Sequence, residues 1–190
     1  MKRVLFAMGF AALIVSCGST KKDETTSEKK AEPVAKSSKA AAVENPNGNA
    51  LTPVLDAYLD VKDALVNDNQ EGAAKAGGTL AVALGSLDLS AFPAGQQKEL
   101  KDIVEVAKNH GEHISESEIG HQREHFEALS KDIKDLAGII GTDRTLYHQF
   151  CPMYDGNKGG MWLSANEEVR NPLFGSSMLK CGRVEEVIKL

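Results

Sequence analysis

The sequence lacks the short motifs that mark the common catalytic sites. Its 190 residues contain no G-x-S-x-G nucleophile elbow, no phosphate-binding Gly-rich loop, no His-Glu-x-x-His zinc motif and no Cys-x-x-Cys pair. Acidic side chains are plentiful, but they fall on the outer faces of predicted helices, which is typical of solvated surfaces. The sequence therefore indicates a protein that is not an enzyme.

An excess of basic residues is also lacking. Lys and Arg number 22 against 27 Asp and Glu, which gives a formal net charge of −5. Proteins that bind nucleic acid use a basic surface to displace counterions from the phosphates. We therefore expect no nucleic-acid partner. An acidic surface attracts cations, although without selectivity.

The chain has one strongly apolar run, and it is too short to cross a bilayer. Lys2 and Arg3 precede residues 4–15, which are almost all apolar, and small residues then lead into Cys17. This arrangement is typical of an export signal and resembles a bacterial lipobox. We expect residues 1–16 to be a lipoprotein signal peptide and Cys17 to carry the lipid that anchors the protein in the cell envelope. An outer-membrane lipoprotein facing the periplasm or the cell surface fits this pattern. An ordinary secreted protein cleaved near Ser16 and an uncleaved apolar N-terminus are the alternatives.

Large apolar residues are nearly absent between the anchor and the rest of the chain. Residues 17–50 are rich in Lys, Glu, Ser, Ala and Asn. Such a segment cannot bury enough apolar surface to offset its chain entropy, so it is predicted to be a disordered tether. Residues 51–190 are long enough to form one domain with its own core.

Apolar residues at three- and four-residue spacing predict four amphipathic helices in this domain. Thr52 is a candidate N-cap, with Pro at the first helical position, and Ser115 with Glu118 resembles a capping box for the fourth helix. Gly77 and Gly78 weaken the second helix, so we expect close packing to compensate. The predicted fold is mainly α, an antiparallel up-down four-helix bundle. The first three helices are expected over residues 52–69, 71–85 and 96–114, and the fourth from its cap at Ser115 to Ile140.

The last forty residues predict a different structure. Residues 146–153 and 161–164 flank a turn-rich, Gly-containing connection, which favours a loose β-hairpin. Residues 175–180 resemble a short helical turn that ends at Gly182. We therefore expect a small irregular or β-hairpin extension packed on the bundle.

This extension carries four sulfur-containing side chains. Cys151 and Met153 lie two apart on the first predicted strand, and Met178 and Cys181 lie three apart on the predicted turn. Each pair is expected to share a face. Thiolate and thioether sulfurs select Cu(I) over hard cations, so these residues are candidate ligands for a copper or silver ion.

Two other interpretations of the cysteines stay open. With Cys17 used for the anchor, Cys151 and Cys181 form an even pair in an oxidising compartment. A disulfide between them closes a loop of about thirty residues, which stabilises a fold by about 3–4 kcal/mol in the chain-entropy estimate. The protein is then a non-catalytic scaffold or interaction lipoprotein. A redox-active pair is the third interpretation.

Histidines provide weaker candidate ligands. His121 and His125 are one helical turn apart, and His110 and His113 lie near the end of the preceding helix. Across an antiparallel pair these four can approach one another, and imidazole suits Cu, Zn and Ni. Histidines at a solvent border are more often plain surface residues. His148 is a candidate auxiliary ligand for Cys151, although on a strand it faces the opposite way.

Two groups of residues together resemble an uncharacterised bacterial domain family marked by a Trp-Leu-Ser motif. The first group is Gln122-Arg123, His125-Phe126 and Leu129-Ser130. The second is Tyr147, Phe150-Cys151-Pro152-Met153, Gly159, Trp162-Leu163-Ser164, Arg170-Asn171-Pro172, Phe174-Gly175 and Met178-Leu179-Lys180-Cys181-Gly182. The resemblance covers residues 51–190, and Leu173 departs from it where the family has Tyr.

Members of this family occur as lipoproteins and fused to Cus-type copper/silver efflux adaptors. The resemblance implies copper or silver handling by analogy. Together with the sulfur residues, it leads us to expect an envelope lipoprotein that binds Cu(I) or Ag(I), either to sequester the ion or to pass it to a metal efflux complex.

Overall fold

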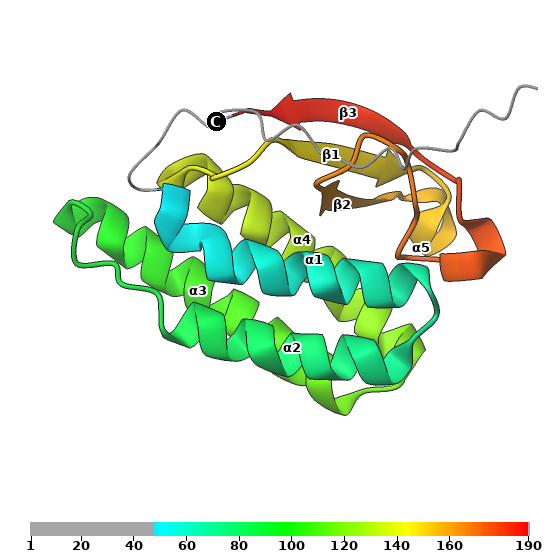
Figure 1. The fold of residues 1–190 in the computed structure, drawn as a ribbon, viewed down its shortest axis with the longest axis horizontal. Coiled ribbons are helices and arrows are strands. Elements are labelled where there is room, and N and C mark those ends of the chain that lie inside the picture. The colour runs from blue at the N-terminus through cyan, green and yellow to red at the C-terminus, as the bar shows by residue number, and fades with distance from the viewer. Residues whose placement is uncertain (1–47, 190) are drawn as a thin grey trace, which may run out of the picture. The chain divides into compact units, whose positions relative to one another are not determined.

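A computed structural model describes residues 48–189 as four long helices followed by a small antiparallel sheet (Figure 1). Each helix packs against the next one in the chain, and α1 also contacts α4, so the predicted four-helix bundle is confirmed. The predicted signal peptide, Cys17 and the tether up to residue 47 lie outside the described residues. The helices are α1 (Thr52–Val66), preceded by the 3₁₀ turn η1 (Gly48–Leu51), then α2 (Gln70–Gly85), α3 (Ala94–Glu116) and α4 (Ile119–Ile140).

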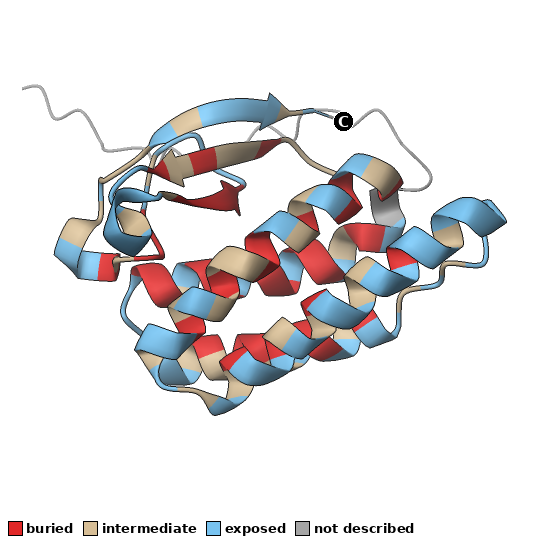
Figure 2. Cartoon of the chain, turned by 180° about the vertical axis from the view of Figure 1, so that it is seen from behind, coloured by how far each residue is buried: buried red, intermediate tan, exposed pale blue. Residues whose placement is uncertain are grey.

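The bundle is held together by the apolar stripes that the sequence predicts. In α4 the buried residues recur at three- and four-residue spacing from Gln122 through Phe126 and Ile133 to Ile140. Gly141 then ends the helix with a φ of 95°, and its N–H donates to the carbonyl of Ala137. Figure 2 shows the buried residues gathered where the helices face one another.

Two predicted helix starts are wrong. Ser115 belongs to the last turn of α3, where its hydroxyl donates to the Glu112 carbonyl, so it caps nothing in α4. The first amide of α4, at Ile119, instead donates to the side-chain oxygen of Gln70, the first residue of α2, at 3.1 Å. Thr52 is likewise inside α1 rather than its N-cap, and its hydroxyl donates to Asp143 at 2.6 Å.

Glycines lower the stability of α2, and one of them allows the close packing that compensates for this loss. A Cβ atom added at Gly77 comes within 2.9 Å of the Gly111 carbonyl oxygen, and one added at Gly111 comes within 3.1 Å of the Gly77 carbonyl oxygen. The backbones of α2 and α3 therefore nearly touch at this pair. Gly78 has no comparable contact, because its nearest neighbour is a Ser115 side-chain atom at 3.8 Å.

The C-terminal extension is a three-stranded sheet in the order β2-β1-β3. Its strands are β1 (Leu146–Cys151), β2 (Gly160–Ser164) and β3 (Arg183–Ile188), with α5 (Tyr154–Asn157) and the 3₁₀ turn η2 (Gly175–Met178) in the connections. The predicted hairpin is β1 and β2. The edge strand β3 was not predicted; Figure 2 shows it largely exposed, whereas β2 is buried along its whole length.

A buried chain of hydrogen bonds joins the sheet to the bundle. The N–H of Leu163 in β2 donates to the Tyr58 hydroxyl of α1 at 2.9 Å. Because the Ser130 hydroxyl of α4 donates to the Phe126 carbonyl at 2.7 Å, it accepts the hydrogen of Tyr58, also at 2.7 Å. Burial raises the pKa of Tyr58, which keeps the phenol protonated.

A second junction connects the segment after β2 to the C-terminal end of α1. Arg123 of α4 donates from Nε to the Pro172 carbonyl at 3.0 Å and from Nη2 to Asp68 at 2.5 Å. Asp68 also accepts from the backbone N–H of Ser176 in η2 at 3.1 Å. Hydrogen bonds from Ser176 and Arg123 hold the pKa of the Asp68 carboxyl below its usual range.

Among residues 48–189, no helix has both the length and the apolar character that crossing a membrane requires.

Replacing Tyr58 with Phe tests the first junction. The change removes the hydroxyl but keeps the ring that stacks on Phe126 at 5.1 Å, so the buried Leu163 N–H loses its acceptor. We expect the free energy of unfolding to fall by about 1–3 kcal/mol. Chemical denaturation measures this loss. Tyr147→Phe, at a partly exposed site, is the control and should change stability by no more than about 0.5 kcal/mol. Equal effects of the two changes contradict the role given to the Tyr58 hydroxyl.

Candidate functional site

The extension brings chemically active side chains to one face of β1. Gln149 pairs with Trp162, and Cys151 pairs with Gly160, across the β1–β2 ladder. Directly paired residues point to the same face of a sheet, so Cys151, Gln149 and Trp162 share one face. Trp162 donates from its ring nitrogen to Gln149 at 2.8 Å, and Gln149 donates in turn to the Asn166 carbonyl at 3.0 Å. The segment that follows β2 therefore covers this face.

The thiols of Cys151 and Cys181 meet under this cover. Both cysteines are free thiols; Cys151 is fully buried and Cys181 is partly exposed. A hydrogen bond between the two side chains, followed by burial, raises the pKa of the Cys181 thiol. These two residues, thirty positions apart, therefore approach each other as the sequence predicts. The pair has one enclosed sulfur and one that solvent or a partner can reach.

Asn171 holds Cys181 against β1. Its side-chain amide donates to the Cys181 carbonyl at 2.8 Å, and its own N–H donates to the Leu179 carbonyl at 2.8 Å. Gly182, with a φ of 142°, then passes so close to the Trp162 ring that an added Cβ would lie 3.0 Å from it. The fully buried Asn171 side chain thus sets the position of the second thiol.

The two predicted thioether ligands are placed differently from expectation. Strand β1 ends at Cys151, and Met153 has helical angles, with φ −88° and ψ −12°, just before α5. It therefore shares no strand face with Cys151, and it is 49 % exposed. Its backbone N–H donates to the sulfur of Cys181. Met178 ends η2 and accepts the Cys181 N–H through its carbonyl at 3.0 Å, which is a backbone contact as well.

The structure does not bring His148 to the thiol pair. His148 pairs with Leu163 on the face opposite to Cys151, as the alternation of a strand requires. Its Nδ1 lies 3.3 Å from Lys134 and 3.6 Å from Glu186. Burial, and then the charge of Lys134, lowers the pKa of His148. Its surroundings are those of a residue that links β1, β3 and α4.

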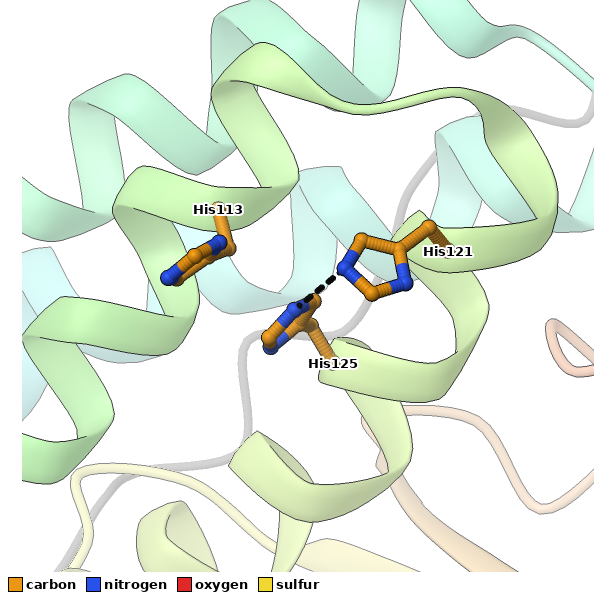
Figure 3. Close-up of side chains that lie close together, drawn as sticks. All are labelled: His113, His121 and His125. Carbon is orange, nitrogen blue, oxygen red and sulfur yellow. Dashed lines mark hydrogen bonds between the residues drawn. The ribbon is translucent and has the colours of Figure 1, made fainter.

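The histidines of α3 and α4 form a second group, shown in Figure 3. One ring nitrogen from each of His113, His121 and His125 lies within 4.8 Å of the other two. The Nε2 atoms of His121 and His125 are 2.9 Å apart, and the rings of His113 and His125 stack with centroids 4.5 Å apart. The expected approach of histidines across the two helices is therefore present. We call these three residues the histidine cluster.

Outer partners fix the two imidazoles of α4. His121 bonds through Nδ1 to the Glu124 carboxylate at 3.0 Å, and His125 bonds through Nδ1 to Nδ1 of His110 at 2.8 Å. His110 in turn faces Asp132, with Nε2 and Oδ2 3.9 Å apart. Both α4 rings therefore direct Nε2 toward each other and have Nδ1 occupied elsewhere.

Burial controls the protonation of this group. Burial, with help from His110 and the other two rings, lowers the pKa of His125 to about 4, so that this imidazole is neutral at pH 7. Burial and His113 also lower the pKa of His110. Burial, and then Asp135, raises the pKa of Asp132 to about 6. A neutral imidazole has a free lone pair, so the cluster can donate nitrogen to a metal ion.

Sequence reasoning missed several residues that shape these sites. Glu124 follows His121 by three positions, a helical spacing that places both on one face. The sequence could therefore have predicted that Glu124 contacts His121. The role of Gln149 could not have been predicted, because a polar residue in a strand is usually solvated rather than bonded to a buried Trp. Asn171 was noted only as part of a motif, and its bond to Cys181 depends on the tertiary fold.

Comparison with known proteins concerns the helical part of the chain. Residues 54–145 match the model of a family described as "Protein of unknown function (DUF3347)". No curated protein and no solved structure matches the chain. The matched residues include the histidine cluster and end just before β1, so both thiols lie outside the match. The bundle of this protein is thus similar to an uncharacterised domain family.

Proposed function

We propose that this protein binds a soft metal ion, Cu(I) or Ag(I), between the thiolates of Cys151 and Cys181. The observation that carries the proposal is the contact between the two thiols beneath the covered face of the sheet. Two thiolates facing each other are a sufficient donor set for these ions, which accept two sulfur ligands in a linear arrangement and prefer sulfur to oxygen. The ion replaces the thiol protons, so binding releases protons.

The unequal exposure of the two cysteines favours a site that exchanges its ion. Cys151 is closed off by the sheet and its cover, whereas Cys181 is partly exposed beside Met153 and Met178. An incoming soft ligand can therefore reach the ion from the Cys181 side. The two methionines contact Cys181 through their backbones, and we propose that their side chains turn toward the ion as auxiliary thioether donors. Such a site suits sequestration of the ion or its hand-over to an efflux complex.

The same contact is also compatible with a structural disulfide, so an experiment has to distinguish metal binding from disulfide formation. In the scaffold alternative, oxidation of Cys151 and Cys181 locks the cover onto β1, and the protein acts through interactions alone. We further propose that residues 1–16 are an export signal and that a lipid on Cys17 holds the protein in the cell envelope, where either role is carried out.

Copper titration tests the thiol site. Full-length protein, reduced under anaerobic conditions, is titrated with Cu(I) in competition with a chromogenic chelator. We expect one Cu(I) per chain. The Cys151→Ser, Cys181→Ser double variant should bind more than about 100-fold more weakly, since even outer partners of a metal site contribute 10–100-fold. Cys17→Ser, which removes the remaining cysteine of the sequence, is the matched control and should bind Cu(I) normally. Copper binding that survives the double substitution contradicts the proposal, and a reduced protein that binds no Cu(I) leaves the scaffold.

Asn171→Ala tests how the second thiol is positioned. The change leaves the Cys181 carbonyl without its donor and the amides of Leu173 and Phe174 without their acceptor. We expect stability to fall by about 1–3 kcal/mol. Cys181 should also react faster with an alkylating reagent under native conditions, as read by mass spectrometry. Asn166→Ala, in the exposed loop after β2, should leave the alkylation rate unchanged. Unchanged reactivity in Asn171→Ala contradicts this role.

Lipid attachment is tested by metabolic labelling of the producing bacterium with an alkyne fatty acid. The full-length protein should incorporate the label and sediment with the membrane fraction. Cys17→Ala should lose the label and leave that fraction, because a lipid chain supplies the free energy of anchoring. Cys181→Ala controls for thiol labelling elsewhere in the chain. Label that persists in Cys17→Ala excludes the proposed anchor.

A further inference from the structure

We propose that His113, His121 and His125 bind a divalent first-row transition ion at the junction of α3 and α4. This site is separate from the thiol pair, since it uses no sulfur and lies on different elements. It does not rest on the proposed function. Its argument comes from the geometry of three imidazoles and of the groups behind them.

The turn between the two helices brings the three rings together. His113 lies in the last turn of α3, His121 in the first turn of α4, and His125 one turn further along α4. Since the helices are antiparallel neighbours, the end of one faces the start of the other. Figure 3 shows the three rings facing a common space beside the turn. The i, i+4 spacing of the α4 pair gives two of the ligands, and α3 supplies the third.

The distances between the ligand nitrogens require only small adjustments: the His121–His125 pair has to open by about 0.5 Å, and His113 has to move closer. Ligand nitrogens around a tetrahedral ion with bonds of 2.0–2.1 Å lie about 3.4 Å apart. The Nε2 atoms of His121 and His125 are already 2.9 Å apart, and the whole group lies within 4.8 Å. The rings of His113 and His125 are nearly parallel, with 10° between their planes, so their lone pairs lie in separate planes. His113 must turn about its side-chain bonds to bind, and its exposure leaves room for that turn.

The outer partners are those that metal-binding histidines use. A ligating imidazole commonly donates its other N–H to a carboxylate or another acceptor, which fixes the tautomer and the ring. His121 has this arrangement with Glu124, at 3.0 Å. His125 has it with His110, at 2.8 Å, and His110 faces the Asp132 carboxylate. Both α4 rings are therefore held with their Nε2 atoms facing each other, and an ion bound there replaces the hydrogen that the two atoms share, which is released as a proton.

The donor set decides the class of ion. Imidazole suits Cu²⁺, Zn²⁺ and Ni²⁺, and three imidazoles without a thiolate do not favour Cu(I) over them. The site is open to solvent, because His113 and His121 are exposed, so water completes the coordination. Glu124, bonded to His121, contributes negative charge close to the cation, whereas Asp132 lies behind His110. Ni²⁺ is the best probe, since it is redox-inert under ordinary conditions.

Nickel titration of the full-length chain tests the site. A Cys17→Ser, Cys151→Ser, Cys181→Ser background excludes any contribution from thiols, so failure of the two sites can be told apart. Calorimetry should give one Ni²⁺ per chain. His121→Ala, His125→Ala should weaken binding by more than about 100-fold, His113→Ala by at least about 10-fold, and Glu124→Gln by about 10-fold through the loss of an outer partner.

His148→Gln is the matched control, because His148 lies on β1 among Lys134 and Glu186, outside the cluster. It should bind Ni²⁺ like the parent. Circular dichroism verifies that each variant is folded, which is expected since two of the three histidines are exposed. Normal affinity in His113→Ala reduces the site to a two-histidine chelate of α4 and overturns the proposal. Normal affinity in the α4 double variant, or an equal loss in His148→Gln, overturns it as well.

Discussion

The Tyr58 hydroxyl is the point on which the arrangement of the C-terminal extension depends. It accepts from the backbone of β2 and donates to Ser130, so one side chain of α1 ties the sheet to α4. All these groups are buried, and an unpaired polar group there costs about 1–3 kcal/mol. The extension therefore cannot slide along the bundle without breaking the whole chain of bonds. β1, which carries Cys151, is aligned through its pairing with β2.

Above the sheet, a second set of bonds transmits this alignment to Cys181. Trp162 is bonded to Gln149, and Gln149 to the carbonyls of the segment after β2. That segment continues to Asn171, which holds the Cys181 carbonyl. The two thiols thus meet because buried polar groups have to form hydrogen bonds with one another, and not because of strand or helix propensity. This accounts for the clustering of motif residues around a pair of cysteines that are thirty positions apart.

The bundle was predictable because its information is local. The three- and four-residue spacing in α4 and the glycine that ends it are contained in one stretch of sequence. The start of α4 was not predictable, since its first amide is satisfied by Gln70, forty-nine positions away. Strand β3 was missed because it is an exposed edge with adjacent charged residues and no apolar alternation. Met153 was misplaced because β1 ends earlier than its apolar pattern suggested.

The candidate sites show the same division. The spacing of His121 and His125 placed them on one helix face, and the predicted antiparallel bundle gave the approach of His113, but the bonds of His121 and His125 to Glu124 and His110 were not predicted. The two donor sets also differ in chemistry. Buried sulfur stabilises the reduced, monovalent form of copper, whereas exposed imidazole favours divalent ions. The two proposed sites therefore differ in the oxidation state they would hold, and they lie on separate elements. The bundle and its extension are therefore better regarded as two chemical surfaces, aligned by the bond between Tyr58 and β2, than as one active centre.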